Sequence, residues 1–404
     1  MGGTVKMKKV AIIGAGASGL LCAIECAKNG LDVSVFEQNS KVAKKILVSG
    51  NGRCNISNTQ LSPQDYFSQN PSFVTYALQN FGYKAFEKYV SDMGLVLQKT
   101  EDGRVYPLSN EAKSVATLLM QHATLLGVKI LTDTKITTLP PLFKDYDAVV
   151  VATGSEAASH LGGCADGYTF AQEFGHTVIP TFASLVQLHL KEKIVKKMTG
   201  AKIFAEVSLY INGQKEMQTQ GDVLFSNYGV SGFAILDISH FVSEALLHFQ
   251  AVDISINLLP EFTIQKLSNH IQKVAKANPL LNIEDILAGL LPQKILKAVL
   301  ETLDIQHATP ITTKLTKKIA NKILHWKFEV TDTHGFRHAE VSGGGVNTQE
   351  INPKTFESYK KKNLYFTGEV LDVVGRRGGF NFAFAWASGY LAAQDIIRKK
   401  LHNN

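Results

Sequence analysis

The sequence has few cysteines and lacks any long apolar run. Its four cysteines are Cys22, Cys26, Cys54 and Cys164, with no Cys-x-x-Cys pair and no His/Cys cluster at zinc-ligand spacing. We therefore expect no bound metal, no disulfide framework and a reducing, cytoplasmic location. The uncharged stretch at residues 10–24 contains three glycines and stops at Glu25, short of the roughly 20 apolar residues that a membrane span needs. No membrane association is expected.

Two common catalytic signatures are also missing. No serine has the G-x-S-x-G surroundings of a hydrolase nucleophile, and no G-x-x-x-x-G-K-[ST] phosphate loop occurs. These absences exclude serine hydrolases and P-loop nucleotidases. His160, His176 and His189 have no metal-ligand spacing, so ordinary core or surface histidines are the simpler interpretation.

The chain is long and basic. Its 404 residues, 45% hydrophobic and 19% charged, predict two or three globular domains. The net charge of +7 comes from short lysine runs without interleaved aromatic residues, which favours solvated helix faces over a nucleic-acid track. A nucleic-acid partner is therefore not expected, and a bound polyanionic cofactor accounts for the charge equally well.

A βαβ pattern opens the chain. Residues 8–13 read as a strand, residues 20–28 as a helix and residues 32–36 as a second strand. Further strands are predicted at residues 128–131 and 148–151. The last of these is almost purely aliphatic, which is typical of a strand buried on both faces of a parallel sheet.

The pattern changes after residue 184. Residues 184–226 read as alternating strands (SLVQLHL, IFAEVSLYI and EMQTQGDVLF) with a hairpin turn at Asn212-Gly213. Helical periodicity then dominates residues 263–325, with breaks at Pro279 and Pro292, and residues 326–332 return to strand. A final helix is predicted to start at residues 378–381 and to end near Ser388-Gly389.

These shifts predict a discontinuous organisation. The expected parts are residues 1–185 (nucleotide-binding domain, first part), 186–260 (inserted β-rich substrate domain), 261–325 (helical module), 326–340 (return strands of the β-rich domain) and 341–404 (nucleotide-binding domain, second part).

A glycine-rich turn carries the first functional signal. In GAGASG, Gly14 allows the tight turn, Gly16 lets the backbone approach a pyrophosphate, and Gly19 lets the helix pack closely on the strand. Glu37 ends the next strand, where it can accept hydrogen bonds from a ribose. With strand, helix and acid in place, the motif predicts dinucleotide binding.

Later segments favour a flavin as the dinucleotide. A flavin ring must be held by segments that return to the same sheet. One such strand ends in Thr153-Gly154, and another, at residues 364–372, ends in a turn containing Glu369 and Asp372. The start of the last helix, residues 379–382, could donate backbone N–H groups to the pyrimidine edge of the flavin. No second G-x-G-x-x-G is present, so NADH or NADPH is expected at most as a transient reductant.

The chain resembles the BaiN-like flavoproteins, also called YhiN-like or aminoacetone-oxidase-like, which are NAD(P)/FAD-dependent oxidoreductases. The resemblance runs nearly end to end and rests on GAGASG, KKILVSGNGRCNISN, ATGS, LFSNYGVSG, EVSGGGVNTQEINPKTFES and LYFTGEVLDVVGRRGGFNFAFAWASG. It implies an α/β fold: a discontinuous two-dinucleotide-type (glutathione-reductase-like) Rossmann FAD-binding domain. It also implies an inserted antiparallel, barrel-like module and a small helical module.

The segment VSGNGRCNISN is the most specific part of the resemblance and looks like a loop on the flavin side. Its glycines permit the backbone to run against the cofactor, and Arg53 can serve the pyrophosphate or a substrate anion. Asn55 and Asn58 are expected to pin the loop through side-chain to backbone bonds. Cys54 is interpreted as a packed thiol, since no resolving cysteine is near in sequence.

The site prediction gathers these segments. The expected cofactor-binding residues are Gly14, Gly16, Ala17, Ser18, Gly19, Glu37, Gln38, Lys45, Gly50, Asn51, Gly52, Arg53, Cys54, Asn55, Thr153, Gly154, Gly368, Glu369, Asp372, Gly379, Phe380, Asn381, Phe382 and Ala383. No catalytic residue is identified. The cavity candidates on position alone are Arg53, Asn227, Tyr228, Arg376 and Arg377, with the arginines expected as partners of an anion or of reduced flavin.

The leading functional hypothesis is an FAD-dependent oxidoreductase. It would transfer hydride between NAD(P)H or a small organic substrate and an acceptor through bound flavin. Two alternatives stay open: a basic flavoprotein that acts on or binds RNA, and a non-catalytic FAD-bound interaction protein. The sequence leaves the oligomeric state, monomer or dimer, undecided.

Overall fold

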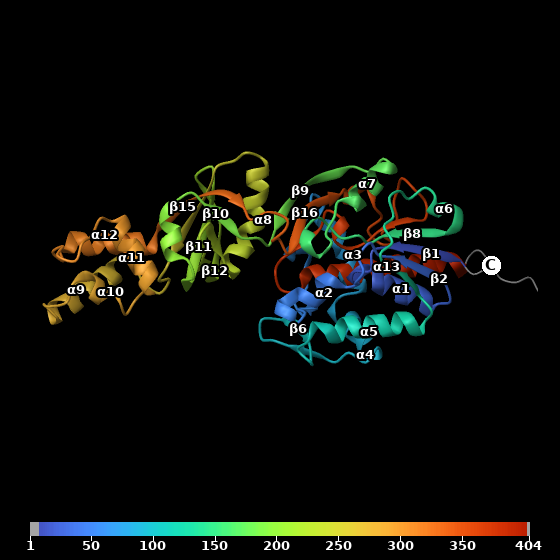
Figure 1. Ribbon diagram of the computed structural model, residues 1–404, viewed down its shortest axis with the longest axis horizontal. Helices are drawn as coiled ribbons and strands as arrows, with labels where there is room; N and C mark the ends of the chain where they lie inside the picture. The colour runs from blue at the N-terminus through green and yellow to red at the C-terminus, as the bar shows by residue number, and fades with distance from the viewer. Residues whose placement is uncertain (1–7, 402–404) are drawn as a thin grey trace, which may run out of the picture. The chain divides into compact units, whose positions relative to one another are not determined.

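The computed structural model describes residues 8–401, which divide into two compact units (Figure 1). The first unit comprises the chain up to Thr181 and from Val341 onward, and the second comprises Phe182–Glu340. Each unit buries its own hydrophobic core. Among the described residues, no helix has the length and apolar character needed to cross a bilayer.

A five-stranded parallel sheet forms the centre of the first unit. In spatial order its strands are β17 (Leu364–Phe366), β8 (Ala148–Val151), β1 (Lys9–Ile13), β2 (Asp32–Phe36) and β7 (Lys129–Leu131). Every residue of β8 is buried, as its aliphatic run predicts. Because neighbouring strands are parallel, the segments that follow β1, β2, β8 and β17 all emerge at one edge of the sheet. The predicted βαβ unit and parallel sheet are confirmed.

Helix α1 (Ala17–Lys28) crosses the long C-terminal helix α13 (Phe380–Leu401). The expectation that the last helix ends near Ser388-Gly389 is wrong, because α13 continues past both residues. A Cβ atom at Gly389 would lie 2.3 Å from the carbonyl oxygen of Ser18. This glycine therefore permits close approach of two helices and does not mark a helix end.

The remaining elements of the first unit surround this sheet. Its other helices are α2 (Lys44–Val48), α3 (Val74–Asn80), α4 (Tyr83–Asp92), α5 (Ala112–Leu125), α6 (Leu142–Asp145) and α7 (Asp166–Glu173). One smaller sheet contains β3 (Ser57–Asn58), β6 (Arg104–Pro107) and β5 (Leu97–Lys99), and a second contains β18 (Val374–Gly375) and β4 (Tyr66–Phe67). A third pairs β16 (Val341–Val346) with β9 (Val178–Ser184), whose last three residues belong to the second unit. Short 3-10 turns include η1 (Ser49–Gly52) and η7 (Gly368–Val370).

The second unit is built on a closed antiparallel barrel. In order around the barrel the strands are β10 (Leu188–Leu190), β13 (Gly229–Ser231), β12 (Gln214–Phe225), β11 (Lys202–Ile211), β14 (Val252–Asn257) and β15 (Trp326–Thr333). Helix α8 (Phe233–Leu247) packs on β12. Asn212 and Gly213 have φ values of 50° and 81°, as the predicted hairpin turn requires.

One predicted strand is split in two. SLVQLHL was expected to be continuous, but β9 ends at Ser184 and β10 begins at Leu188. Leu185 has a φ of 50°, which interrupts the extended backbone. The two halves consequently pair in different sheets, β9 with β16 and β10 within the barrel.

A helical module follows β14 in the second unit. It consists of α9 (Ile264–Ala277), α10 (Ile283–Leu287), α11 (Gln293–Thr302) and α12 (Thr313–Leu324). Thr263, Asn282 and Thr312 cap the N-termini of α9, α10 and α12 by accepting a hydrogen bond from a backbone N–H in the first turn. The predicted prolines lie between helices, Pro279 after α9 and Pro292 at the start of α11.

Candidate flavin-binding site

The turn between β1 and α1 is shaped by its glycines. Gly14 has a φ of +106°, and a Cβ there would lie 2.4 Å from the carbonyl oxygen of Ala152. A Cβ at Gly19 would lie 2.0 Å from the carbonyl oxygen of Gly14. At Gly16, in contrast, no atom lies within 4 Å of the Cβ position. Two glycines thus serve packing, and Gly16 presents bare backbone to open space.

Helix α1 begins at this open space without a local acceptor for its first N–H groups. Its N-cap is Gly16, no side chain caps it, and its first turn, which includes Ala17 and Ser18, holds no acidic residue. Ser18 is buried, and its hydroxyl donates to the carbonyl of Thr367 at 3.5 Å. An uncapped helix N-terminus carries a partial positive charge. The cradle therefore fits the pyrophosphate of a dinucleotide.

Glu37, at the end of β2, is tied to this turn. Its Oε2 accepts a hydrogen bond from the backbone N–H of Ala15 at 3.0 Å. Its Oε1 accepts from the backbone N–H of Asn39 at 2.9 Å and from the Asn39 amide at 2.6 Å. The next residue, Gln38, donates to the carbonyl of Gly162 at 3.1 Å. The carboxylate is oriented by the loop and keeps acceptor capacity for a ribose hydroxyl.

The Glu369 carboxylate contacts three residues from distant parts of the sequence of the first unit. Its carboxylate lies 2.9 Å from Lys45 Nζ, and it accepts hydrogen bonds from the Ser155 hydroxyl at 2.5 Å and the Ser342 backbone N–H at 3.0 Å. Lys45 and Glu369 were predicted site residues, but Ser155 and Ser342 were missed. The only sequence signal was the place of Ser155 directly after Ala-Thr-Gly. The predicted pair Thr153-Gly154 precedes it at the end of β8.

One buried hydroxyl near this edge, that of Thr367, which follows β17, lacks a partner among the described residues. Tyr168, on α7, is also buried, and its pKa is raised well above the ordinary value by burial and by the charge of Glu369, an effect reduced by a hydrogen bond with Ser342. Gly368 has a φ of +73°, and its N–H donates to the Ser388 hydroxyl at 2.9 Å. Unpaired polar atoms are expected where a polar ligand completes a site.

In the loop at residues 48–58, several residues close together in sequence have left-handed backbone conformations. Gly50, Asn51, Gly52 and Cys54 have φ values of 57°, 56°, 81° and 59°. Burial raises the pKa of Cys54 to about 11, an effect reduced by the neighbouring Ser49 side chain. Cys54 is therefore a protonated, packed thiol at neutral pH, which agrees with its sequence interpretation.

The predicted asparagine pins are present and tie this loop to the start of α13. Asn58 Nδ2 donates to the carbonyl of Gly378 at 2.9 Å, and its Oδ1 accepts from the N–H of Gln60 at 2.8 Å. With its amide oxygen turned toward Gly379, Asn55 accepts from the Gly379 N–H at 3.2 Å. A Cβ at Gly379 would lie 2.2 Å from the carbonyl oxygen of Ser57. The loop and the helix start thus form one packed element.

The first residues of α13 have mainly structural side chains. Asn381 accepts from the N–H of Gly375 and donates to its carbonyl, both at 2.8 Å. Phe380 packs edge-on against Tyr66, and Phe382 stacks on Trp386. Ala383 is buried and donates its N–H to the carbonyl of Gly379 at 3.0 Å. Only their backbone groups are suited to the predicted flavin contact.

Asp372 also serves the fold. It is 5% exposed and accepts hydrogen bonds from the backbone N–H of Gln69 at 2.9 Å and the Ser68 hydroxyl at 3.3 Å. These bonds anchor the segment that follows β4. Asp372 was predicted as a cofactor residue, and its carboxylate is already engaged by this segment.

The predicted arginines differ in their surroundings. Arg53 is exposed, with its guanidinium 5.0 Å from the centre of the Tyr106 ring. Arg376 is exposed and forms an ion pair with Asp65 at 3.0 Å. Arg377 follows it and is half-buried. Because Asp65 neutralises Arg376, Arg53 is better suited to meet an anionic ligand.

Asn227 and Tyr228 lie in the second unit, between β12 and β13. The Tyr228 ring stacks on His334 with centroids 4.2 Å apart and planes at 10°. His189 Nε2 lies 2.8 Å from His334 Nδ1, and the His338 ring packs against that of His334 with centroids 4.2 Å apart. Burial, with His338 and His189, lowers the pKa of His334. Sequence reasoning missed this histidine cluster because His189 and Tyr228 are more than 100 residues away from His334 and His338 in the chain.

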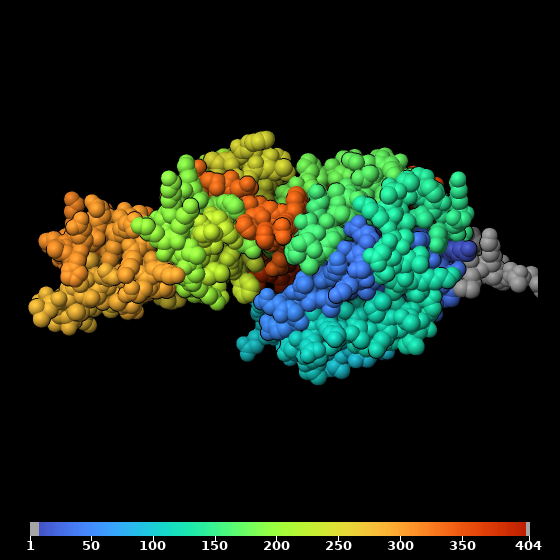
Figure 2. All heavy atoms as spheres, viewed as in Figure 1, coloured from blue at the N-terminus to red at the C-terminus, as the bar shows by residue number. Residues whose placement is uncertain are grey.

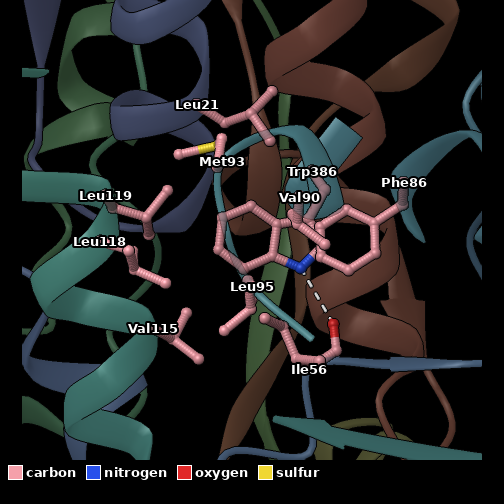
Figure 3. Close-up of a pocket in the computed structure, with 10 residues that line it drawn as sticks. All are labelled: Leu21, Ile56, Phe86, Val90, Met93, Leu95, Val115, Leu118, Leu119 and Trp386. Carbon is pink, nitrogen blue, oxygen red and sulfur yellow. Dashed lines mark hydrogen bonds between the residues drawn. The ribbon is translucent and has the colours of Figure 1, made fainter. Parts of the chain in front are cut away.

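An apolar pocket also opens in the first unit (Figure 3). Its lining residues are Leu21, Ile56, Phe86, Val90, Met93, Leu95, Val115, Leu118, Leu119 and Trp386. The indole N–H of Trp386 is already donated to the carbonyl of Ile56 at 2.9 Å. The walls offer no free hydrogen-bonding group to orient a substrate, so we assign this pocket to core packing.

The parallel sheet, glycine turn, uncapped helix and acid after β2 define a Rossmann-type dinucleotide-binding protein. The chain belongs to the family described as HI0933-like protein Rossmann domain, whose model matches residues 8–395. The family resemblance and the fold class expected from the sequence are thereby confirmed. The chain is an FAD-dependent oxidoreductase by family.

Three relatives align over nearly the whole chain, each with 96% of this chain and 98% of the relative covered. A Clostridium scindens protein named 3-dehydro-bile acid delta(4,6)-reductase is 33% identical. A Haemophilus influenzae protein named ribosomal RNA dihydrouridine synthase is 34% identical. An Escherichia coli protein of the same name is 30% identical.

Proposed function

We propose that the protein is an FAD-dependent reductase of carbon–carbon double bonds conjugated with a carbonyl group. The observation that carries this proposal is the pair of names borne by relatives at 33% and 34% identity. A 3-oxo steroid with 4,6 double bonds and a uracil ring look unrelated, but each has a ring C=C conjugated with C=O. Reduction of that group is the chemistry the two names share.

The proposed reaction adds two electrons and two protons to the conjugated double bond. A hydride adds to the carbon β to the carbonyl, a proton taken up from solvent adds to the α carbon, and the double bond becomes single. FAD, when bound and reduced, supplies the hydride. NADH or NADPH is the proposed source of the two electrons that reduce the flavin, although no second G-x-G-x-x-G is present.

In this proposal the chain's own residues bind and orient the FAD cofactor. The backbone of Gly16 and the N-terminus of α1 would hold the pyrophosphate, and Glu37 would accept from the ribose. Lys45 and Glu369 would position the remainder of the cofactor from the carboxyl edge of the sheet. Backbone N–H groups at the start of α13 would favour the negative charge of reduced flavin.

The test is an anaerobic visible spectrum of the purified protein in two stages. First, NADH or NADPH is added, and bleaching of the flavin bands is expected. Second, a 4,6-dien-3-one steroid or an unmodified uridine-containing RNA transcript is added, and the flavin bands should return. The matched controls are a saturated 3-oxo steroid and the same transcript with dihydrouridine in place of uridine.

Each outcome decides one part of the proposal. A colourless protein that cannot be reconstituted with FAD contradicts the flavin assignment. Bleaching followed by equal reoxidation with the saturated controls contradicts the assignment to conjugated double bonds. A bound flavin that neither nicotinamide reduces removes NAD(P)H as donor, and dithionite-reduced protein then tests the acceptor half alone.

A further inference from the structure

Helices α9 and α12 lie side by side in the helical module. The Ser268 and Thr316 hydroxyls are 2.8 Å apart, and Gln272 donates to the same threonine oxygen at 3.0 Å. The Thr313 hydroxyl in turn donates to Gln272 Oε1 at 3.4 Å. As the residue number rises along α9 from 268 to 272, the contacts on α12 shift from Thr316 toward Thr313. The two helices are therefore antiparallel.

The outer faces of this pair carry only positive charge. Helix α9 contains Lys266, Lys273 and Lys276, helix α12 contains Lys314, Lys317, Lys318 and Lys322, and neither contains Asp or Glu. Leu267 and Ile271 of α9 and Ile319 and Ile323 of α12 point into the core. Apart from Lys322, these lysines are exposed. In Figure 2 atoms of this yellow-orange to orange part of the second unit are visible at the surface.

The charge on this face is uncompensated. Among residues 8–401, no carboxylate forms an ion pair with any of these lysines. Elsewhere in the second unit, ion pairs with acidic side chains occupy Lys191, Lys197, Lys202 and Lys297. Lysines three or four residues apart on one helix, such as Lys273 and Lys276 or Lys314 and Lys317, repel each other, and a polyanion that binds across them relieves that repulsion. We call the six exposed lysines, 266, 273, 276, 314, 317 and 318, the α9–α12 basic face.

We propose that the α9–α12 basic face binds the phosphodiester backbone of RNA. The inference rests on the proposed function, because uridine in RNA is one of the two substrate types that function admits, and it names RNA as the substrate class. It takes up the alternative of a basic flavoprotein that binds RNA, which the sequence left open, against the expectation of no nucleic-acid partner.

The spacing and composition of the face favour a nucleic-acid backbone. Lysines three or four residues apart on a helix stand about 5 Å apart along its axis, and seven residues span about 10 Å. An extended row of such charges suits a chain of phosphates better than a single compact anion. The exposed positions of the two helices hold no Phe, Tyr or Trp on which bases could stack. Binding is therefore expected to depend on charge and not on sequence.

The test compares two variants with equal charge loss. The face variant carries Lys273→Gln, Lys276→Gln, Lys314→Gln and Lys317→Gln. The control variant carries Lys191→Gln, Lys197→Gln, Lys202→Gln and Lys297→Gln, which removes four paired lysines from the same unit. Filter binding to unmodified ribosomal RNA fragments is measured from 50 to 300 mM salt. Circular dichroism and the flavin spectrum of each holoprotein verify folding.

The face variant should bind RNA at least about tenfold more weakly at low salt. Its plot of log Kd against log salt should also flatten by about 0.7 for each phosphate that the lysines no longer neutralise. The control variant should change less than threefold, because exposed ion pairs contribute little and its lysines are already neutralised. Unchanged RNA affinity in the face variant, or an equal weakening in the control, overturns the proposal. So does preferential binding of the wild type to phosphatidylglycerol vesicles, which would identify a membrane as the polyanion.

The failure of this inference can be told apart from failure of the proposed function. Reoxidation of reduced flavin by a small conjugated acceptor reports only the reductase chemistry and should be equal in all three proteins. If the face variant binds RNA more weakly but no protein reduces the double bond, RNA binding by the basic face is supported and the proposed reaction is contradicted. If the double bond is reduced but the face variant binds RNA normally, only the RNA-binding role of the basic face is contradicted.

Discussion

The glycine turn gives the sharpest prediction, because alanine substitutions of two nearby glycines should affect different properties of the protein. Gly19→Ala places a Cβ 2.0 Å from the carbonyl oxygen of Gly14, in the packed contact between strand and helix. Gly16→Ala places a Cβ where no atom lies within 4 Å. The first substitution should damage the fold, and the second should damage only cofactor binding.

The magnitudes follow from these surroundings. An ordinary carbon–oxygen contact is about 3.3 Å, so Gly19→Ala forces backbone to move by more than about 1 Å, which costs roughly 3 kcal/mol. For a unit of this size that lowers Tm by about 6 to 12 °C. At Gly16, φ is −87°, which alanine adopts without strain. The remaining cost of alanine at an N-cap is about 1 kcal/mol or less.

FAD affinity separates the two roles. The Gly16 methyl group would stand where the pyrophosphate approaches the backbone, and loss of one charge-assisted hydrogen bond costs about 1.5 to 3 kcal/mol. A Kd increase of about 10- to 100-fold is expected for Gly16→Ala. Thermal unfolding of the apoprotein and titration with FAD by fluorescence quenching measure the two effects. Wild-type FAD affinity in a folded Gly16→Ala protein would refute the assignment of this cradle.

Three further predictions test other parts of the chain. Burial lowers the pKa of His240 to about 4, below its ordinary value, so the unfolded state binds more protons between about pH 6.5 and 4. Unfolding free energy should therefore fall by about 2 kcal/mol between pH 7 and 4.5, and urea titrations of His240→Gln should show a correspondingly weaker dependence. Phe86→Ala should enlarge the apolar pocket and cost about 3 to 5 kcal/mol in the same assay, with FAD affinity per folded molecule unchanged. Lys45→Met should leave Glu369 without its cationic partner and weaken FAD binding, whereas exposed Lys84→Met should not.

Much of the site could be predicted because its signals are local. The turn, helix start and acid of the first βαβ unit lie within residues 14–37, and each follows from the conformational needs of a few neighbouring residues. The same holds for the hairpin at Asn212-Gly213 and for the pins at Asn55 and Asn58. The aliphatic run of β8 indicated a buried parallel strand for the same reason.

Other roles depend on pairings between distant segments. Glu369 meets Ser155, 214 residues away, and Ser342 only because β8, β16 and η7 converge at one edge of the sheet. Asn381 and Asp372 looked like ligands by position, but folding turns their side chains toward Gly375 and Gln69. Local periodicity contains no information about such partners, since any polar residue in a turn has the same signature.

The sequence by itself determined the nucleotide-binding turn, the order of strands and helices, and the family, because these depend on short-range backbone preferences and on contiguous motifs. Only the tertiary structure decided that Gly389 lies inside a helix crossing, that Arg376 is neutralised by Asp65, and that two lysine-bearing helices 36 residues apart form one basic face. The physical reason is that exposure, charge compensation and close approach are properties of packed surfaces, and these exist only when distant segments of the chain come together.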